Sequence, residues 1–130
     1  MQHIQNYVMG EWVSGQGEEL IAKDAVHGTE IGIVSSAGLD YKAILEYGRR
    51  VGGPALRKMT FQERGRMLKA LALHLVKIKN QFYETSFKTG ATKIDSWVDI
   101  EGGFGNLFAN ASLRRQFPDL PYYVDGQHAP

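Results

Sequence analysis

The sequence predicts an α/β protein in which short strands near the N-terminus are followed by a segment dominated by helices. Three observations support this fold class. Apolar residues alternate between turn signals within residues 1–36, and they recur at helical spacing within residues 39–116. The composition, 43% hydrophobic and 22% charged, is ordinary for a globular protein. A chain of 130 residues is also long enough to form one domain with a core.

The first 36 residues are predicted to form two or three short strands between residues 6 and 35. Gly10 divides "NYVMGEWVSG" into two short apolar runs, a pattern typical of a β-hairpin. The segment 30–36, "EIGIVSS", alternates weakly and follows the turn signal His27-Gly28.

The first predicted helix covers residues 39–51. Ile44, Tyr47 and Val51 recur at helical spacing, and Asp40 suits the positive end of the helix dipole. The run Gly52-Gly53-Pro54 is expected to stop this helix.

The second predicted helix, residues 60–88, has the strongest start signal in the chain. "TFQE", from Thr60 to Glu63, fits a capping box, and Thr89-Gly90 is expected to end the helix. Its apolar residues recur at steps of four, four, three and four, which places them on one face. We expect this stripe to pack within the chain; it comprises Met67, Leu71, Leu75, Ile78 and Phe82.

The third predicted helix runs from about Lys93 to Arg115 and ends before Pro118. It is rich in glycine, and because glycine weakens a helix, we expect this one to depend on packing partners. The following segment, 121–126, reads as a strand that enters a turn.

Bulk properties exclude several classes of protein. A net charge of +1 provides no general attraction for nucleic acid or an anionic membrane, so neither is an expected partner. The absence of cysteine excludes a disulfide scaffold, a thiolate zinc site and a cysteine nucleophile within these residues. We find no signal-peptide pattern and no apolar run of membrane-spanning length, which predicts a cytoplasmic protein. The sequon Asn110-Ala111-Ser112 is therefore interpreted as chance.

Three carboxylates within seven residues form the first candidate site. Asp95 and Asp99 are four residues apart and share a helical face, whereas Glu101 is rotated well away from Asp99. A metal site needs more ligands, and the nearest histidine in sequence is His74. We interpret the three carboxylates as solvated or structural and predict no metal site.

The glycine cluster "GGFGNLF" forms the second candidate site. Gly103 and Gly105 fit the beginning of a dinucleotide fingerprint, but Phe108 stands where the third glycine is needed. The cluster also lies inside a helical pattern instead of directly after a strand. We therefore predict no cofactor-binding residue here and interpret the glycines as positions where another backbone approaches closely.

The histidines form no recognisable catalytic group. His3, His27 and His128 fall in predicted loops or near the termini, and His74 lies beside the apolar stripe as a packed helix residue. Spacing alone supports no serine–histidine–acid triad, so we predict no catalytic residue.

The order of these features resembles the beginning of the aldehyde dehydrogenase superfamily. That superfamily opens with an "xGxW" hairpin, a strand of the type "dPxTGexIgxV" and a long helix that ends in "TG". Val26-His27 departs from the usual proline-containing turn. The positions that match the three motifs are Gly10, Trp12, Gly28, Ile31, Gly32, Val34, Arg64, Leu68, Leu75, Glu84, Thr89 and Gly90.

Within that superfamily, "TGATKIDSWVDIEGGFGNLFANASL" resembles one branch in particular. In this branch the dehydrogenase is fused to a hot-dog hydratase domain and takes part in ring opening during bacterial phenylacetate degradation. The semialdehyde dehydrogenases of aerobic benzoate breakdown share the pattern. The resemblance extends over residues 7–126.

The resemblance implies that residues 1–130 form the N-terminal portion of an aldehyde dehydrogenase domain, in which 121–126 begins an oligomerisation strand. The family's cysteine nucleophile, general-base glutamate and dinucleotide loop lie downstream, so no catalytic, cofactor-binding or metal residue transfers to this chain. The implied activity of the parent is NADP-dependent (or NAD-dependent) oxidation of an aldehyde on a ring-opened CoA thioester. The implied partner is the remainder of that dehydrogenase, and we also expect a homo-oligomer.

A second hypothesis comes from a different class of protein. The chain would be a stand-alone interaction or assembly module derived from the beginning of an aldehyde dehydrogenase. A stop codon directly after Pro130 favours this module, whereas a continuation that contains a cysteine nucleophile favours the enzyme.

Overall fold

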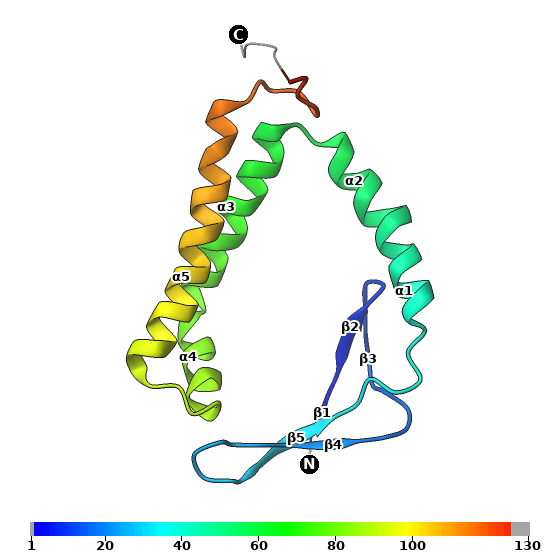
Figure 1. Ribbon diagram of the computed structural model, residues 1–130, viewed down its shortest axis with the longest axis vertical. Helices are drawn as coiled ribbons and strands as arrows, with labels where there is room; N and C mark the ends of the chain where they lie inside the picture. The colour runs from blue at the N-terminus through cyan, green and yellow to red at the C-terminus, as the bar shows by residue number, and fades with distance from the viewer. Residues whose placement is uncertain (1, 126–130) are drawn as a thin grey trace. The chain divides into compact units, whose positions relative to one another are not determined.

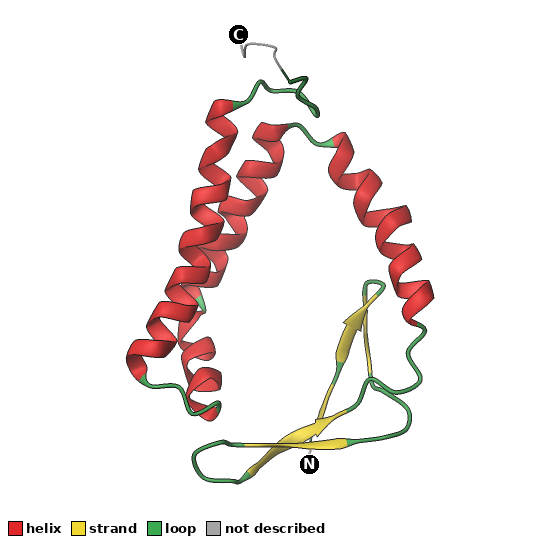
Figure 2. Cartoon of the chain, in the orientation of Figure 1, coloured by secondary structure: helices red, strands yellow, loops and turns green. Residues whose placement is uncertain are grey.

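The computed structural model describes residues 2–125, which divide into two compact units. The first unit contains the residues up to Gly53 together with Lys88–Gly90, and the second contains Pro54–Phe87 and the residues from Ala91 onwards. Strands occur in the first unit and long helices in the second, as the colours of Figure 2 show. This confirms the predicted α/β class with short N-terminal strands followed by helices.

The first unit contains five short strands, four of which lie within residues 6–35, where two or three were predicted. They make a three-stranded sheet in the order β1-β5-β4 and a separate hairpin of β2 and β3. In the sheet, β5 pairs in parallel with β1 and antiparallel with β4. The strands are β1 (His3–Ile4), β2 (Asn6–Val8), β3 (Glu11–Val13), β4 (Leu20–Lys23) and β5 (Glu30–Val34).

The hairpin predicted at Gly10 is present. Val8 pairs with Glu11, so Met9 and Gly10 form a two-residue loop. Both loop residues have positive φ, 52° and 85°, as in the turns whose twist matches that of antiparallel strands. Across the hairpin, the rings of Tyr7 and Trp12 lie 5.0 Å apart between their centroids.

A tight turn links β4 to β5 and contains the predicted signal His27-Gly28. The carboxylate of Asp24 accepts hydrogen bonds from the backbone N–H groups of Val26 (2.7 Å) and His27 (3.0 Å). These bonds favour the ionised carboxyl and hold the pKa of Asp24 below its usual value. Gly28 completes the turn with a φ of 69°.

The first helical segment begins as predicted but does not stop where predicted. Asp40 caps α1 (Tyr41–Tyr47) by accepting from the backbone N–H of Ala43 at 2.9 Å. The chain then passes through a π-helical turn, Gly48–Gly52, into α2 (Gly53–Lys58). Gly53 keeps helical dihedral angles and its N–H donates to the carbonyl of Gly48, so the helical backbone continues without a break through Pro54, with the π-helical turn directly before the proline. The expected stop at 52–54 is therefore wrong.

The predicted helix 60–88 is present in two pieces, α3 (Phe61–Lys77) and α4 (Lys79–Lys88). The capping box is complete. Thr60 Oγ1 accepts from the N–H of Glu63 at 3.2 Å, and Glu63 Oε2 accepts from the N–H of Thr60 at 2.8 Å. The helix is interrupted at Ile78, whose φ of −106° and ψ of 12° leave the α region. Gly90, with a φ of 87°, follows the end of α4 as predicted.

The third predicted helix is α5 (Lys93–Ser112), continued by the 3₁₀ turn η2 (Leu113–Gln116). It ends before Pro118, as predicted. Residues 121–125 carry no strand in the described part of the chain, and Gly126 lies outside it. The proposal that 121–126 begins an oligomerisation strand therefore stays a prediction, because such a strand would be paired by residues outside this chain.

The core of the second unit lies between α3 and α5, which run side by side and antiparallel in Figure 1. Buried residues on this interface are small on the α3 side, namely Gly65 and Ala72, and they face Phe104 and Ala111 of α5. A Cβ at Gly65 would lie 2.9 Å from the carbonyl oxygen of Ala111, so the two helices approach closely at this point.

The predicted apolar stripe packs only in part. Met67 and Leu71 are 43% and 46% exposed, whereas Leu75, Ile78 and Phe82 are half-buried. The stripe was assigned from bulky residues alone. The face of α3 that meets α5 carries glycine and alanine, because small residues permit close packing of the helices. Met67 and Leu71 are therefore less completely covered within the chain than the rest of the stripe.

Candidate functional site

Asp95, the first of the three candidate carboxylates, caps α5. Its Oδ2 accepts a hydrogen bond from the hydroxyl of Thr92 at 2.6 Å and from the backbone N–H of Thr92 at 3.2 Å. In return, Thr92 Oγ1 accepts from the N–H of Asp95 at 3.2 Å, which completes a second capping box. The hydrogen bond from the Thr92 hydroxyl is the main reason that the pKa of Asp95 lies below its usual value.

Glu101 lies on another side of α5 and joins it to α4. Its Oε1 is 2.7 Å from Lys79 Nζ and accepts a longer hydrogen bond, 3.4 Å, from the hydroxyl of Tyr83. The hydrogen bond to Glu101 raises the pKa of Lys79. Burial raises the pKa of Tyr83, and the nearby charge of Glu101 adds to this effect. These three groups therefore form an ion pair with a phenol attached, and the ion pair holds two helices together.

The structure does not bring the three carboxylates together. Asp99 is exposed on α5, while Asp95 is held at the N-terminus of the helix and Glu101 is directed to Lys79. Within residues 2–125, no group of three or more histidine and acidic side chains is placed to hold a metal ion. Asp95 and Glu101 each make a contact that stabilises α5, which is the geometry expected of structural carboxylates.

The glycine cluster lies in the middle of α5. Its backbone N–H groups are engaged in the helix and do not open into a loop that could hold a pyrophosphate. A Cβ added at Gly102, Gly103 or Gly105 would meet no atom within 4 Å. The predicted close approach of another backbone is thus not made by the described part of this chain.

Gly65, by contrast, is the glycine on which internal packing depends, and sequence reasoning missed it. The available signal was the spacing of Gly65 and Ala72, seven residues apart on one face of a strongly predicted helix. A pair of small residues at that spacing indicates a line of close contact.

The histidines lie apart from one another. His3 Nδ1 is 3.9 Å from an oxygen of Glu19, and His27 Nδ1 is 3.5 Å from Asp24. His74 is exposed on α3, so its interpretation as a packed helix residue is wrong. His128 lies outside the described residues.

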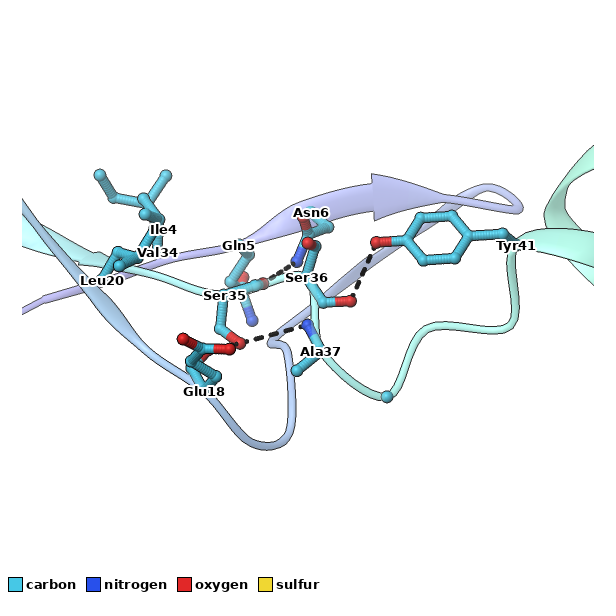
Figure 3. A pocket seen from close by; sticks show the side chains of 11 residues that line it. Ile4, Gln5, Asn6, Glu18, Leu20, Val34, Ser35, Ser36, Ala37 and Tyr41 are labelled. Atoms are coloured by element: carbon cyan, nitrogen blue, oxygen red, sulfur yellow. Dashed lines mark hydrogen bonds between the residues drawn. The ribbon is translucent and has the colours of Figure 1, made fainter.

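The first unit contains a groove with a volume of about 520 Å³. Figure 3 shows its polar side chains turned toward neighbouring backbone. Ser35 Oγ donates to the carbonyl of Glu18 at 2.6 Å, Asn6 Nδ2 donates to the carbonyl of Ser35 at 2.8 Å, and Tyr41 donates to the carbonyl of Ser36 at 3.1 Å. The groove is lined by Ile4, Gln5, Asn6, Glu18, Leu20, Val34, Ser35, Ser36, Ala37, Gly38 and Tyr41.

These hydrogen bonds give the groove a structural role. Each of the three side chains is hydrogen-bonded to the protein's own backbone, and the hydroxyl hydrogen of Ser35 is donated to the carbonyl of Glu18. These bonds hold the segment that follows β5 in place.

Comparison with known proteins gives a class and then a particular relative. No protein-family model matches the chain. The chain is nevertheless related to the aldehyde dehydrogenases, as its motifs predicted. It is 37% identical over 100 residues to 3,4-dehydroadipyl-CoA semialdehyde dehydrogenase from Aromatoleum evansii. The match covers 76% of this chain and 19% of the relative, so the chain spans about one fifth of that protein's length.

The similarity confirms the predicted relationship to aldehyde dehydrogenases at the level of the class. The name of the relative describes a dehydrogenase acting on a semialdehyde of a CoA thioester. Assignment to the fused, ring-opening branch and the preference for NADP remain predictions. No helix in the described part of the chain is both long enough and apolar enough to cross a membrane.

Proposed function

We propose that this chain is the N-terminal part of an NADP-dependent dehydrogenase that oxidises a semialdehyde carried on a CoA thioester. The single observation that carries the proposal is the 37% identity to a CoA-semialdehyde dehydrogenase over three-quarters of this chain. The more specific form of the proposal is the bifunctional ring-opening enzyme of phenylacetate degradation, supported by the resemblance of residues 89–113 to that branch.

The role that we assign to this chain is that of a scaffold. On α5, Asp95 takes part in a helix cap and Glu101 in an interhelical ion pair, and the groove residues hold their own backbone. Such contacts fix the positions of helices and strands without contacting a substrate. The chemical groups of the reaction are proposed to lie elsewhere in a longer polypeptide, since this chain contains no cysteine to act as the nucleophile.

The described residues do not fit a dinucleotide. Phosphate groups of such cofactors are held by free N–H groups at the start of a helix that follows a strand. Here the glycines lie within α5, and the N-terminus of α5 is closed by the Thr92–Asp95 capping box, whose carboxylate would repel a phosphate. The nicotinamide cofactor is therefore proposed to be held by the remainder of the dehydrogenase.

A fusion protein tests this function. The chain would replace the corresponding fifth of the Aromatoleum evansii enzyme, and the fusion would be assayed with 3,4-dehydroadipyl-CoA semialdehyde by following NADPH formation. We expect the fusion to oxidise the aldehyde and the isolated chain of 130 residues to show no oxidation. The unmodified enzyme serves as the control. A fusion that is folded, as judged by its thermal melt, but inactive would contradict the proposal.

The alternative is a stand-alone interaction module, and one observation supports it. Apolar residues are exposed on both units, for example Trp12 in β3 and Trp97 in α5. Exposed apolar surface and open strand edges promote association, and such a module would use them to bind its partner. The coding sequence after Pro130 discriminates between them, since the module requires a stop codon there.

A further inference from the structure

The three-stranded sheet has an open edge at β4. This strand is the outer one in the order β1-β5-β4, and within residues 2–125 it pairs with β5 alone. Leu20 and Ile21 of β4 are 65% and 50% exposed. An open edge presents N–H and C=O groups that a strand from another chain can pair.

Hydrogen bonds on the other side of β5 show which backbone groups of β4 face this edge. Ile33 of β5 donates its N–H to the carbonyl of Gln2, next to β1, at 3.0 Å. Ile21, which pairs with Ile33, therefore turns its own N–H and C=O away from β5. Because this direction alternates along a strand, Glu19 and Lys23 turn theirs to the open edge as well.

The residues between and beside these three face inward, as the alternation requires. The N–H of Asp24 donates to the carbonyl of Thr29 at 2.8 Å, and the carbonyl of Glu18 accepts from Ser35 Oγ at 2.6 Å. The extra residue of the β-bulge between the two strands is Ile31, which belongs to β5, so the alternation along β4 is unbroken.

The segment 19–23 is complementary in charge and size to a second copy of itself. Two such segments can pair antiparallel about a twofold axis at Ile21. Glu19 of each copy then lies opposite Lys23 of the other, on the face of the sheet that carries Ile21 opposite Ile21. On the other face, where Figure 3 shows Leu20 beside Ile4 and Val34, Leu20 lies opposite the small Ala22.

Other pairings of the two edges lose this complementarity. A shift by one residue sets outward-facing groups against inward-facing ones, and a shift by two removes both pairs of opposite charge. Parallel pairing in register places Lys23 beside Lys23. Within residues 2–125, Lys23 makes no ion pair, and Glu19 makes only a contact of 3.9 Å with His3, so both charges can pair with another copy.

We propose that the open edge of β4 is a contact between two copies of this chain, in which β4 pairs antiparallel with β4 through Glu19 and Lys23. The contact involves the first unit alone and is independent of the proposed dehydrogenase function. Because so short a strand buries little surface, the dimer should be weak, with a dissociation constant on the order of 0.1–1 mM that increases with salt.

Exchange of the charges tests the contact by sedimentation equilibrium. Glu19→Lys and Lys23→Glu should each weaken dimerisation roughly tenfold, because each places like charges opposite one another at both ends. An equimolar mixture of the two variants should dimerise as the unmodified chain does, since opposite charges then meet again. Glu84→Lys and Lys42→Glu are the matched controls at exposed positions and should leave dimerisation unchanged.

A cross-link tests the register. The chain contains no cysteine, so Ile21→Cys introduces a single thiol. Opposite residues of a hydrogen-bonded antiparallel pair have Cα atoms about 5.5 Å apart, within the range of a disulfide. Under oxidation, Ile21→Cys should form a covalent dimer severalfold faster than the control Leu20→Cys, whose two copies are offset along the strands.

Each alternative result overturns the proposal. A chain that stays monomeric at millimolar concentration has no such contact. Dimerisation that both single charge variants leave unchanged would belong to other exposed residues, such as Trp12 or Trp97. Weakening by both single variants without recovery in their mixture would show that the two charges do not face each other. Faster cross-linking of Leu20→Cys than of Ile21→Cys would exclude the pairing about Ile21.

Discussion

Gly65 of α3 lies directly against Arg114 of η2. A Cβ at position 65 would be 2.6 Å from Cδ of Arg114 and 2.9 Å from the carbonyl oxygen of Ala111. The arginine can shift, but the carbonyl belongs to the backbone of α5. The distance between the two helices at this end of the second unit is therefore set by the absence of a side chain at residue 65.

The first prediction concerns this contact. Gly65→Ala should lower the free energy of unfolding by roughly 1–2 kcal/mol, because the overlap outweighs the gain in helix propensity. Gly102→Ala is the matched control. It adds the same methyl group in open space and should raise the stability by about 0.5–1 kcal/mol. Urea denaturation monitored by circular dichroism measures both variants, and equal effects would contradict the packing described.

The second prediction concerns the start of α3. Thr60→Ala removes the hydroxyl that accepts from Glu63 N–H and should destabilise the chain by about 1 kcal/mol. Thr60→Ser keeps a hydroxyl at the same position and should retain most of the stability. Denaturant titrations of both variants are the measurement. A loss for serine as large as that for alanine would show that the cap does not act through its oxygen.

The third prediction concerns the stability of the chain at acidic pH. The pKa of Asp95 in the folded chain lies below the ordinary value of 3.8. Its contribution to stability is therefore complete above that ordinary value and is lost as the pH falls through the lower value of the folded state. Asp95→Asn should flatten the decrease in thermal stability below pH 3.8 relative to the unmodified chain. If the melting temperatures of the two proteins fell equally steeply with pH in this range, the prediction would be contradicted.

The fourth prediction concerns the ion pair between α4 and α5. The pKa of Lys79 is raised above 10.5, so its contribution is present below that value and is lost as the pH rises through the higher pKa of the folded state. Glu101→Gln should lower the melting temperature at neutral pH, and the difference should shrink in high salt because both side chains are partly exposed. A double-mutant cycle with Lys79→Met measures the coupling, and a coupling of zero would show that the pair contributes nothing.

The fifth prediction tests whether the carboxylates of α5 are structural or take part in the reaction. In the fusion with the related dehydrogenase, changing Asp95, Asp99 or Glu101 to the matching amide should alter thermal stability or assembly more than the rate of aldehyde oxidation. Single-turnover kinetics beside thermal melts provide the comparison. An amide variant that stays folded and assembled, but loses oxidation by orders of magnitude, would show that the carboxylate takes part in the reaction.

Local signals in the sequence predicted local structure well. The capping box at Thr60, the hairpin at Gly10 and the helix end at Gly90 all depend on a few neighbouring residues, and all three are present. The stop expected at Gly52-Gly53-Pro54 was wrong because the backbone passes through a π-helical turn at Gly48–Gly52 and stays helical through Pro54.

Non-local features were harder to predict. The periodicity of α3 identified an apolar stripe, but which face of a helix is buried depends on the element that packs against it. In α3, the residues buried by this packing are Gly65 and Ala72. The interruption at Ile78 leaves no mark on the apolar spacing. Among the candidate carboxylates, the separation of Glu101 from Asp99 followed from helical geometry, whereas its pairing with Lys79 required the packing of two helices.

The antiparallel arrangement of α3 and α5 has a consequence for synthesis on the ribosome. The contacts of this pair come from one uninterrupted stretch, Phe61 to Arg114, and both helices begin with a complete capping box. The two capping boxes are local contacts, which form rapidly, and chains fold in the order in which they emerge. The helical pair can therefore assemble as soon as α5 has left the exit tunnel.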